Sequence, residues 1–300
     1  ACPMVGARMV LPGNRMDAAS LHELLAGERV TFAVGVPTIW TMLLAHMAEQ
    51  GVKLTALDRC LVAGTALPPA VRKALKEVHG VTAIHAWGMT ETSPIGTIST
   101  PTPEVLALPE GEREAELLKQ GRVPFGSEIQ VRDAEGRVAP KNGETFGPLW
   151  IRGPWIASGY FKGEGGQVLG ADGWFPTGDV ATWDELGFMK ITDRTKDVIK
   201  SGGEWISSID VENAAMSHPK VALAAAVAAY HPKWDERPVL VVVPKDGQDI
   251  TREEMLEFLA PRMAKWWLPD DVVCVSDLPM TATGKILKSK LREQYWKRLE

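Results

Sequence analysis

The chain has 300 residues, of which 45% are hydrophobic and 24% are charged, a composition typical of a globular protein of about two domains. The net charge is −5, so the chain as a whole has no excess of positive charge that would attract nucleic acid. The longest apolar stretches, 221–230 and 239–243, are far shorter than the roughly 20 residues of a membrane span. The three cysteines show no metal-ligand spacing, which fits a reducing compartment. We therefore expect a cytoplasmic protein with no nucleic-acid partner and no integral membrane segment.

The first residues are apolar and have no charged leader, initiator Met or helix cap. We expect that the chain starts inside a domain and not at a natural boundary.

Strands and helices alternate in the first hundred residues. Helices are predicted at 20–27, 37–51 and 68–80, and strands at 30–36, 59–63 and 81–87. Ser20 and Glu23 form a capping-box pattern, and Pro37 is a favourable first residue of a helix. The apolar run 30–36 predicts a buried strand. Such alternation implies a parallel sheet, whose ligands collect beyond the carboxyl ends of the strands.

The rest of the chain shows other sequence patterns. Residues 99–120 form a Pro- and Glu-rich excursion, helical around 112–119, and 121–193 are short strands and Gly turns with a hairpin about 184–187. Beyond 196 we expect a helix at 209–217, strands at 221–230 and 238–243, and a helix opened by Thr251 that reaches Met263. The predicted fold is an α/β portion with a small β unit, followed by a small α+β domain. The predicted domains are 1–195 (1–98 α/β, 99–120 excursion, 121–195 β unit) and 196–300.

Thr90 and Glu91 follow the strand at 81–87. A hydroxyl beside a carboxylate can hold a phosphate oxygen and Mg²⁺, although the pair also suits a helix cap. Asp179 could accept hydrogen bonds from ribose hydroxyls or form an Asx turn. Asp193 and Arg194 could contact a phosphate or ribose at a domain junction, or form a solvated surface pair.

Two later segments complete the set of candidate motifs. Gly202 and Gly203 predict a tight loop that admits a ligand close to the backbone, or an ordinary turn. Lys285 lies in a Gly/Thr loop, where a cation could stabilise negative charge or be merely solvated. A series of basic residues near the end predicts a solvated helix face: Lys288, Lys290, Arg292, Lys297 and Arg298.

The order and spacing of these loops carry a resemblance over essentially the whole length. Segments 87–94, 173–179, 193–204 and 279–285 resemble four core motifs of the AMP-forming acyl-CoA synthetase (adenylate-forming) superfamily, in their usual sequence. The stretch 191–212 is most similar to the fatty-acyl branch, which includes medium-chain and 3-methylmercaptopropionate CoA ligases. The resemblance implies that a carboxylate attacks the α-phosphate of ATP to give acyl-AMP, and that coenzyme A then displaces AMP.

The resemblance also implies roles for individual residues. The adenine would be bordered by Gly64, Thr65, Ala66, Trp87 and Gly88. Asp179 and Arg194 would hold the ribose, Thr90 the phosphate and Glu91 the Mg²⁺. Lys285 would bridge the carboxylate and the α-phosphate.

A hinge, a coenzyme A tunnel and an acyl pocket are implied in the same way. Lys196 takes the hinge position about which the small domain rotates, and Gly202 and Gly203 would line the pantetheine tunnel. The acyl pocket would be formed by Val36, Trp40, His85 and Met89. For Trp40, packing in the core is the favoured interpretation, because large apolar residues are usually buried.

The superfamily's Ser/Thr/Gly-rich phosphate loop is absent from these 300 residues, so we expect the chain alone to be inactive in adenylation. Two alternatives remain open: a short non-catalytic protein that binds nucleotide or coenzyme A, and an adenylating enzyme that loads a carrier-protein thiol. A homodimer also remains open.

Overall fold

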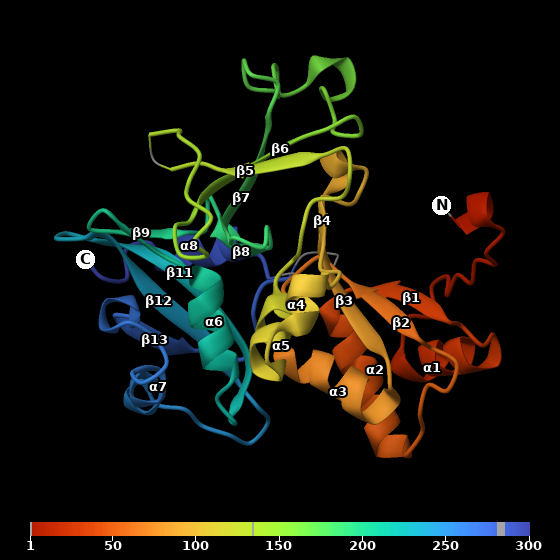
Figure 1. The fold of residues 1–300 in the computed structure, drawn as a ribbon. Helices are drawn as coiled ribbons and strands as arrows, with labels where there is room; N and C mark the ends of the chain where they lie inside the picture. Colours follow the sequence, from red (N-terminus) through yellow and green to blue (C-terminus); the bar gives the residue numbers. More distant parts are fainter. Residues whose placement is uncertain (1, 134, 281–285) are drawn as a thin grey trace. The chain divides into compact units, whose positions relative to one another are not determined.

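A computed structural model describes residues 2–133, 135–280 and 286–300 of the chain (Figure 1). Contacts divide the chain into two compact units, each described by itself below. The first contains residues 1–145, 150–177 and 182–191, and the second contains 146–149, 178–181 and 192–300. The predicted boundary between 195 and 196 stays a prediction.

The first sheet has the order β1-β2-β3-β4, with the first three strands parallel and β4 antiparallel to β3. Its strands are β1 (Phe32–Gly35), β2 (Arg59–Val62), β3 (Thr82–Trp87) and β4 (Thr97–Ile98). Helix α1 (Ala18–Gly27) precedes β1, whereas α2 (Pro37–Gln50) connects β1 to β2 and α3 (Pro69–His79) connects β2 to β3. The three helices share one apolar core with β2 and β3 (Figure 1). The predicted alternation and parallel sheet are confirmed.

Local signals account for most helix ends in this part. Pro37 occupies the first turn of α2, and Gly51 ends the helix at a φ of +64°. Helix α1 differs from the prediction, because it begins at Ala18 and its cap is Asp17, whose carboxylate accepts the N–H of Ser20 at 2.9 Å. The capping box at Ser20 was therefore wrong: an Asp three residues earlier already bonds that N–H.

Strand β1 is an edge strand and not the predicted buried one. Phe32 and Val34 are 45% and 65% exposed, because only β2 pairs with β1 among the described residues. An apolar run is equally compatible with a central strand and an edge strand, so pattern alone could not distinguish them.

The excursion at 99–120 is helical in two pieces, α4 (Pro103–Ala107) and α5 (Glu110–Leu118). A second sheet follows, with the order β5-β6-β7-β8. Its strands are β5 (Glu128–Val131), β6 (Gly147–Arg152), β7 (Phe175–Trp183) and β8 (Met189–Arg194). The predicted hairpin about 184–187 is confirmed. Asp179, considered above for an Asx turn, lies within strand β7.

The third sheet has the order β10-β9-β12-β11, and β13 also pairs with β12. Its strands are β9 (Ile199–Ser201), β10 (Glu204–Ile206), β11 (Val221–His231), β12 (Asp235–Pro244) and β13 (Asp271–Cys274). Alternate residues of β11 enter two separate cores: Ala224, Ala226 and Ala228 face α6 (Ser208–Met216) and α7 (Arg252–Leu259), while residues 225, 227 and 229 face α8 (Lys288–Tyr295). The cap of α7 by Thr251 is confirmed, but the helix ends at Leu259, before the predicted Met263.

Candidate functional site

The loop after β3 is built around Thr92, whose side chain is fully buried. Its hydroxyl oxygen accepts the N–H of Met89 at 2.9 Å and donates toward the carbonyl oxygen of Pro94 at 2.7 Å. A single 3₁₀ turn, Thr90–Thr92, results. Thr90 is exposed and Glu91 partly buried, so a buried side chain fixes the turn that carries both predicted phosphate-site residues.

Two glycines make this loop compact. A Cβ on Gly88 would lie 1.8 Å from the carbonyl oxygen of Pro94, and a Cβ on Gly96 would lie 2.2 Å from the Trp87 ring. No side chain fits at either position without a shift of the backbone or of the buried indole. Gly88 is thus explained by close approach within the loop.

Glu91 has a partner that the sequence analysis missed. The Tyr160 hydroxyl donates to Glu91 Oε1 at 2.6 Å, and the N–H of Ala157 donates to the Glu91 carbonyl oxygen at 2.8 Å. The hydrogen bond to the Glu91 carboxylate raises the pKa of the Tyr160 phenol. Tyr160 is 69 residues away in a Gly-rich loop, and no local pattern connects the two positions.

His85 connects β3 to the loop that follows β2. Its Nδ1 donates to the Leu118 carbonyl oxygen at 2.7 Å, and its Nε2 accepts the N–H of Leu67 at 3.3 Å. Burial lowers the pKa of His85 and so favours the neutral ring that this pattern requires. The ring thereby orients the segment that contains Gly64, Thr65 and Ala66, where Gly64 has a φ of +96°.

The other predicted acyl-pocket residues lie around the start of α2 and the end of β3. Trp40 is 2% exposed and belongs to the core shared by α1–α3, in agreement with the packing interpretation. Val36 precedes α2 and its side chain faces Gly64, whereas Met89 is partly buried in the loop after β3. His85 uses both ring nitrogens within the protein, so its contribution here is to fix the loop after β2.

In the second unit, the predicted ribose residues contact one another. Arg194 Nε lies 3.5 Å from Asp179 Oδ1; the aspartate is 8% exposed and the arginine mostly exposed. The neighbouring Asp193 is not the surface group considered above. It is 1% exposed and accepts the N–H groups of Arg194 at 2.7 Å and Ser208 at 2.6 Å. Burial raises the pKa of Asp193.

Lys288 contradicts the prediction of a solvated basic face. Its Nζ lies 2.6 Å from Glu212 Oε1 and 2.6 Å from the Ser208 hydroxyl. Arg292 likewise pairs with Asp197. Burial raises the pKa of Glu212 to about 7, with Lys288 acting in the opposite direction. The charge pattern could not reveal this, because acidic partners 76 and 95 residues away meet α8 only in the folded chain.

The predicted glycine loop is the two-residue turn of the hairpin β9–β10. Gly202 and Gly203 have φ values of +58° and +91°, and a Cβ on Gly202 would lie 2.7 Å from the Trp234 ring. Lys196 is exposed in the turn after β8. Lys285 lies outside the described residues.

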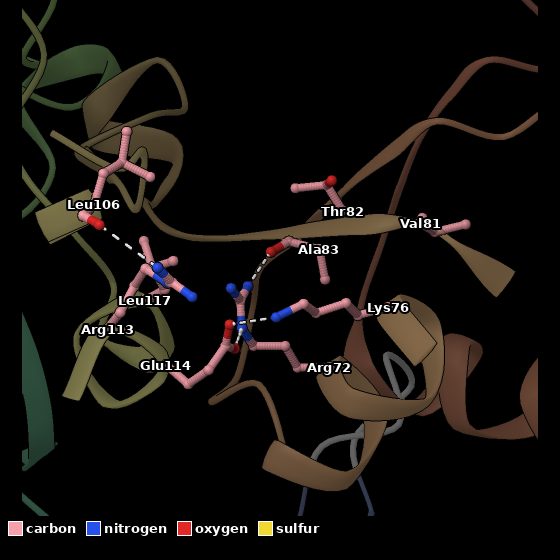
Figure 2. A pocket seen from close by; sticks show the side chains of 9 residues that line it. All are labelled: Arg72, Lys76, Val81, Thr82, Ala83, Leu106, Arg113, Glu114 and Leu117. Atoms are coloured by element: carbon pink, nitrogen blue, oxygen red, sulfur yellow. Dashed lines mark hydrogen bonds and ion pairs between the residues drawn. The ribbon is translucent and has the colours of Figure 1, made fainter. Parts of the chain in front are cut away.

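One cavity of about 200 Å³ opens between α3, β3 and the excursion helices (Figure 2). Figure 2 shows the Glu114 carboxylate between Arg72, at 2.8 Å, and Lys76, at 2.9 Å. Arg72 also donates to the Ala83 carbonyl. These cations already have partners, and none of the predicted site residues lines the cavity, so it is separate from the candidate site.

No group of three or more His, Cys, Asp or Glu side chains that could hold a metal occurs among the described residues. Mg²⁺ does not need one, since it is commonly bound through one or two carboxylates together with substrate phosphates and water. Glu91, with a hydroxyl next to it and one carboxylate oxygen bonded to Tyr160, has oxygen donors that fit such an ion. In the described part of the chain, no helix is both long and apolar enough to span a membrane.

Comparisons with known proteins agree with these features. Residues 1–161 match the family model of the AMP-binding enzyme, and residues 210–285 match that of the AMP-binding enzyme C-terminal domain. A 3-methylmercaptopropionyl-CoA ligase of Ruegeria lacuscaerulensis is 49% identical over 98% of this chain and 54% of its own length. A medium-chain-fatty-acid–CoA ligase of Ectopseudomonas oleovorans is 46% identical over 97% of this chain and 53% of its own.

Among solved structures, the anthranilate CoA ligase AuaEII in complex with anthranoyl-AMP superimposes with a TM-score of 0.80 at 26% identity. The alignment covers 96% of this chain and 54% of that one. The chain thus spans about half the length of the curated relatives that it matches.

Proposed function

The chain belongs to the AMP-binding enzyme family, and we propose that it acts in an acyl-CoA ligase. A carboxylate oxygen would form a bond to the α-phosphorus of ATP as pyrophosphate leaves. The thiol of coenzyme A, losing its proton, would then form the thioester as the bond from acyl carbon to AMP breaks. The observation that carries the proposal is that relatives aligned with nearly the whole chain are named as acyl-CoA ligases.

The nucleotide roles follow the chemistry of each group. We assign the ribose hydroxyls to Asp179, because a carboxylate can accept hydrogen bonds from both, and the aspartate is already oriented by Arg194. The loops at 64–66 and 87–88 would border adenine. What supports this role is their position directly after the parallel strands β2 and β3.

Thr90 would meet the phosphate and Glu91 would ligate Mg²⁺ through carboxylate oxygen. When bound, the ion would neutralise negative charge that develops on the phosphate oxygens. The protein's own part is to keep both groups in one fixed turn, which the buried Thr92 hydroxyl accomplishes.

Lys285 would place a cation between the attacking carboxylate and the α-phosphate. Lys196 would act as the hinge, and Gly202 and Gly203 would border the pantetheine arm. Support for the last role comes from the hairpin turn, where Gly203 has open space around the position that a Cβ would take, so that a ligand chain can approach its backbone. A cytoplasmic location is part of the same proposal.

The acid would be a medium-chain fatty acid or 3-methylmercaptopropionate, the acids named for the two relatives above. The test supplies the acyl adenylates (acyl-AMP) of both acids and of a long-chain acid. Chromatography then measures the acyl-CoA that the chain forms from each of them and coenzyme A. We expect the adenylates of the two favoured acids to react fastest, and we expect Asp179→Ala to lower their rate of conversion to acyl-CoA at least tenfold. Asp246→Ala, which alters an exposed carboxylate, is the matched control.

The proposal would be refuted if the chain bound none of the acyl adenylates and formed acyl-CoA from none of them above the uncatalysed rate. Faster transfer to the thiol of a carrier protein than to coenzyme A would favour the carrier-loading alternative. Binding of nucleotide or coenzyme A without any transfer would favour the non-catalytic one.

A further inference from the structure

The loop between β6 and β7 bonds Glu91 twice. The N–H of Ala157 donates to the Glu91 main-chain oxygen at 2.8 Å, and the hydroxyl of Tyr160 donates to its Oε1 at 2.6 Å. Both elements belong to the first unit. Main chain and side chain of one residue are therefore held from the same neighbouring loop.

The hydroxyl is the only hydrogen-bond partner that the described residues give the Glu91 carboxylate. A distance of 2.6 Å is typical of an O–H donor to an ionised carboxylate, which is stronger than a neutral hydrogen bond. Because Oε1 is committed to the phenol, the carboxylate has one orientation, with Oε2 as the oxygen left for a cation.

We propose that Tyr160 is a positioning residue for Glu91, which fixes the carboxylate so that its second oxygen meets the Mg²⁺ that accompanies the nucleotide. The inference rests on the proposed function. Tyr160 itself contacts neither metal nor phosphate in this arrangement. It acts through Glu91, as outer partners of metal ligands generally do, and loss of such partners typically costs 10–100-fold in metal affinity.

Tyr160→Phe is a suitable variant because it removes one oxygen from a side chain that is 45% exposed. The probe is Mn²⁺ in the presence of ATP, with bound and free Mn²⁺ measured by electron paramagnetic resonance. We expect the Mn²⁺ dissociation constant to rise about tenfold in Tyr160→Phe and further in Glu91→Gln, with unchanged melting temperatures. Tyr230→Phe is the matched control, since Tyr230 is also exposed, packs against Trp296 and has no described contact with Glu91.

The outcomes separate this inference from the proposed function. Weaker Mn²⁺ binding in Glu91→Gln but wild-type binding in Tyr160→Phe would overturn the positioning role and leave Glu91 as ligand. Wild-type binding in Glu91→Gln, or no Mn²⁺ binding by the unaltered chain with ATP, would overturn the metal role of Glu91 itself.

A second measurement separates an effect on the metal ion from a direct effect on nucleotide binding. In Tyr160→Phe the ATP affinity measured without divalent cation should equal that of the unaltered chain. A fall in metal-free ATP affinity would mean that Tyr160 contacts the nucleotide directly, and would contradict the proposal.

Discussion

Gly88 shows how one residue determines the shape of a loop. Its neighbour across the loop is the carbonyl oxygen of Pro94, so the space that a Cβ would need is taken by backbone and not by a flexible side chain. The hydroxyl of Thr92 bonds the same carbonyl. Any residue larger than glycine must therefore displace the turn that carries Thr90 and Glu91.

We expect Gly88→Ala to lower the free energy of unfolding by about 2–3 kcal/mol, since overpacking against well-ordered atoms costs this much. Urea unfolding followed by tryptophan fluorescence measures the effect. Gly27→Ala is the control: Gly27 ends α1, has open space around its Cα, and should gain up to about 1 kcal/mol from the helical preference of alanine. Equal stability of the two variants would contradict the close approach at Gly88.

At the scale of elements, the buried network of Lys288, Glu212 and Asp193 joins α8, α6 and the end of β8. Two carboxylates and one ammonium are withdrawn from water here, and backbone N–H groups complete their hydrogen bonds. Such an arrangement is stable only while all members are present, because a buried charge without its partner is costly.

Lys288→Met should lower the free energy of unfolding by about 3 kcal/mol at pH 8, as expected when a buried ion pair loses one partner. Burial raises the pKa of Glu212 from 4.5 to about 7. A carboxyl group whose pKa is raised by folding stabilises the protein below its unfolded pKa, and that contribution is lost as the pH rises through the folded value.

The cost of Lys288→Met should therefore be smaller at pH 5, where Glu212 is protonated, than at pH 8. Denaturant titrations at both pH values test this, with the exposed Lys290→Met as a control that should change stability by less than about 0.5 kcal/mol. If Lys288→Met lowered the free energy of unfolding equally at both pH values, the expected stabilisation of the ionised Glu212 carboxylate by Lys288 would be contradicted.

At the scale of the whole molecule, the residues proposed for the two half-reactions are distributed over both units. Thr90 and Glu91 belong to the first unit, and Asp179, Arg194 and Lys196 belong to the second. The proposed hinge lies at the start of the second unit's long carboxyl-terminal segment. In the proposed function, Lys285 serves the first half-reaction only and is removed from the site for the second.

Lys285→Ala should thus abolish acyl-AMP formation, by more than about 100-fold, while thioester formation from supplied acyl-AMP stays within a few fold. A chimera that joins this chain to the part of the Ruegeria relative that it does not cover gives a protein of that relative's full length for the first assay. Pyrophosphate exchange measures the first step and acyl-CoA release the second. Equal loss of both would refute the separation of roles.

Much about this protein could be predicted from local sequence. Proline and glycine set the ends of α2 and α3, Thr251 caps α7, and the alternation of strands and helices predicts a parallel sheet with loops after β2 and β3. The order of short motifs indicated the family, which the family models confirm. These features depend on neighbouring residues or on spacing along the chain, and both are visible in one dimension.

Tertiary structure decided the rest, because the deciding contacts join residues far apart in sequence. Tyr160 contacts Glu91 across 69 residues, and Lys288 pairs with an acidic side chain from another helix, partly buried, instead of forming a solvated face. Whether a run such as 30–36 is central or at an edge depends on which strands pair with it. The 300 residues by themselves therefore determined the family, and they predict a two-part organisation and a set of candidate loops. Only the folded chain decided which side chains orient those loops, since burial and the choice of partners arise from packing.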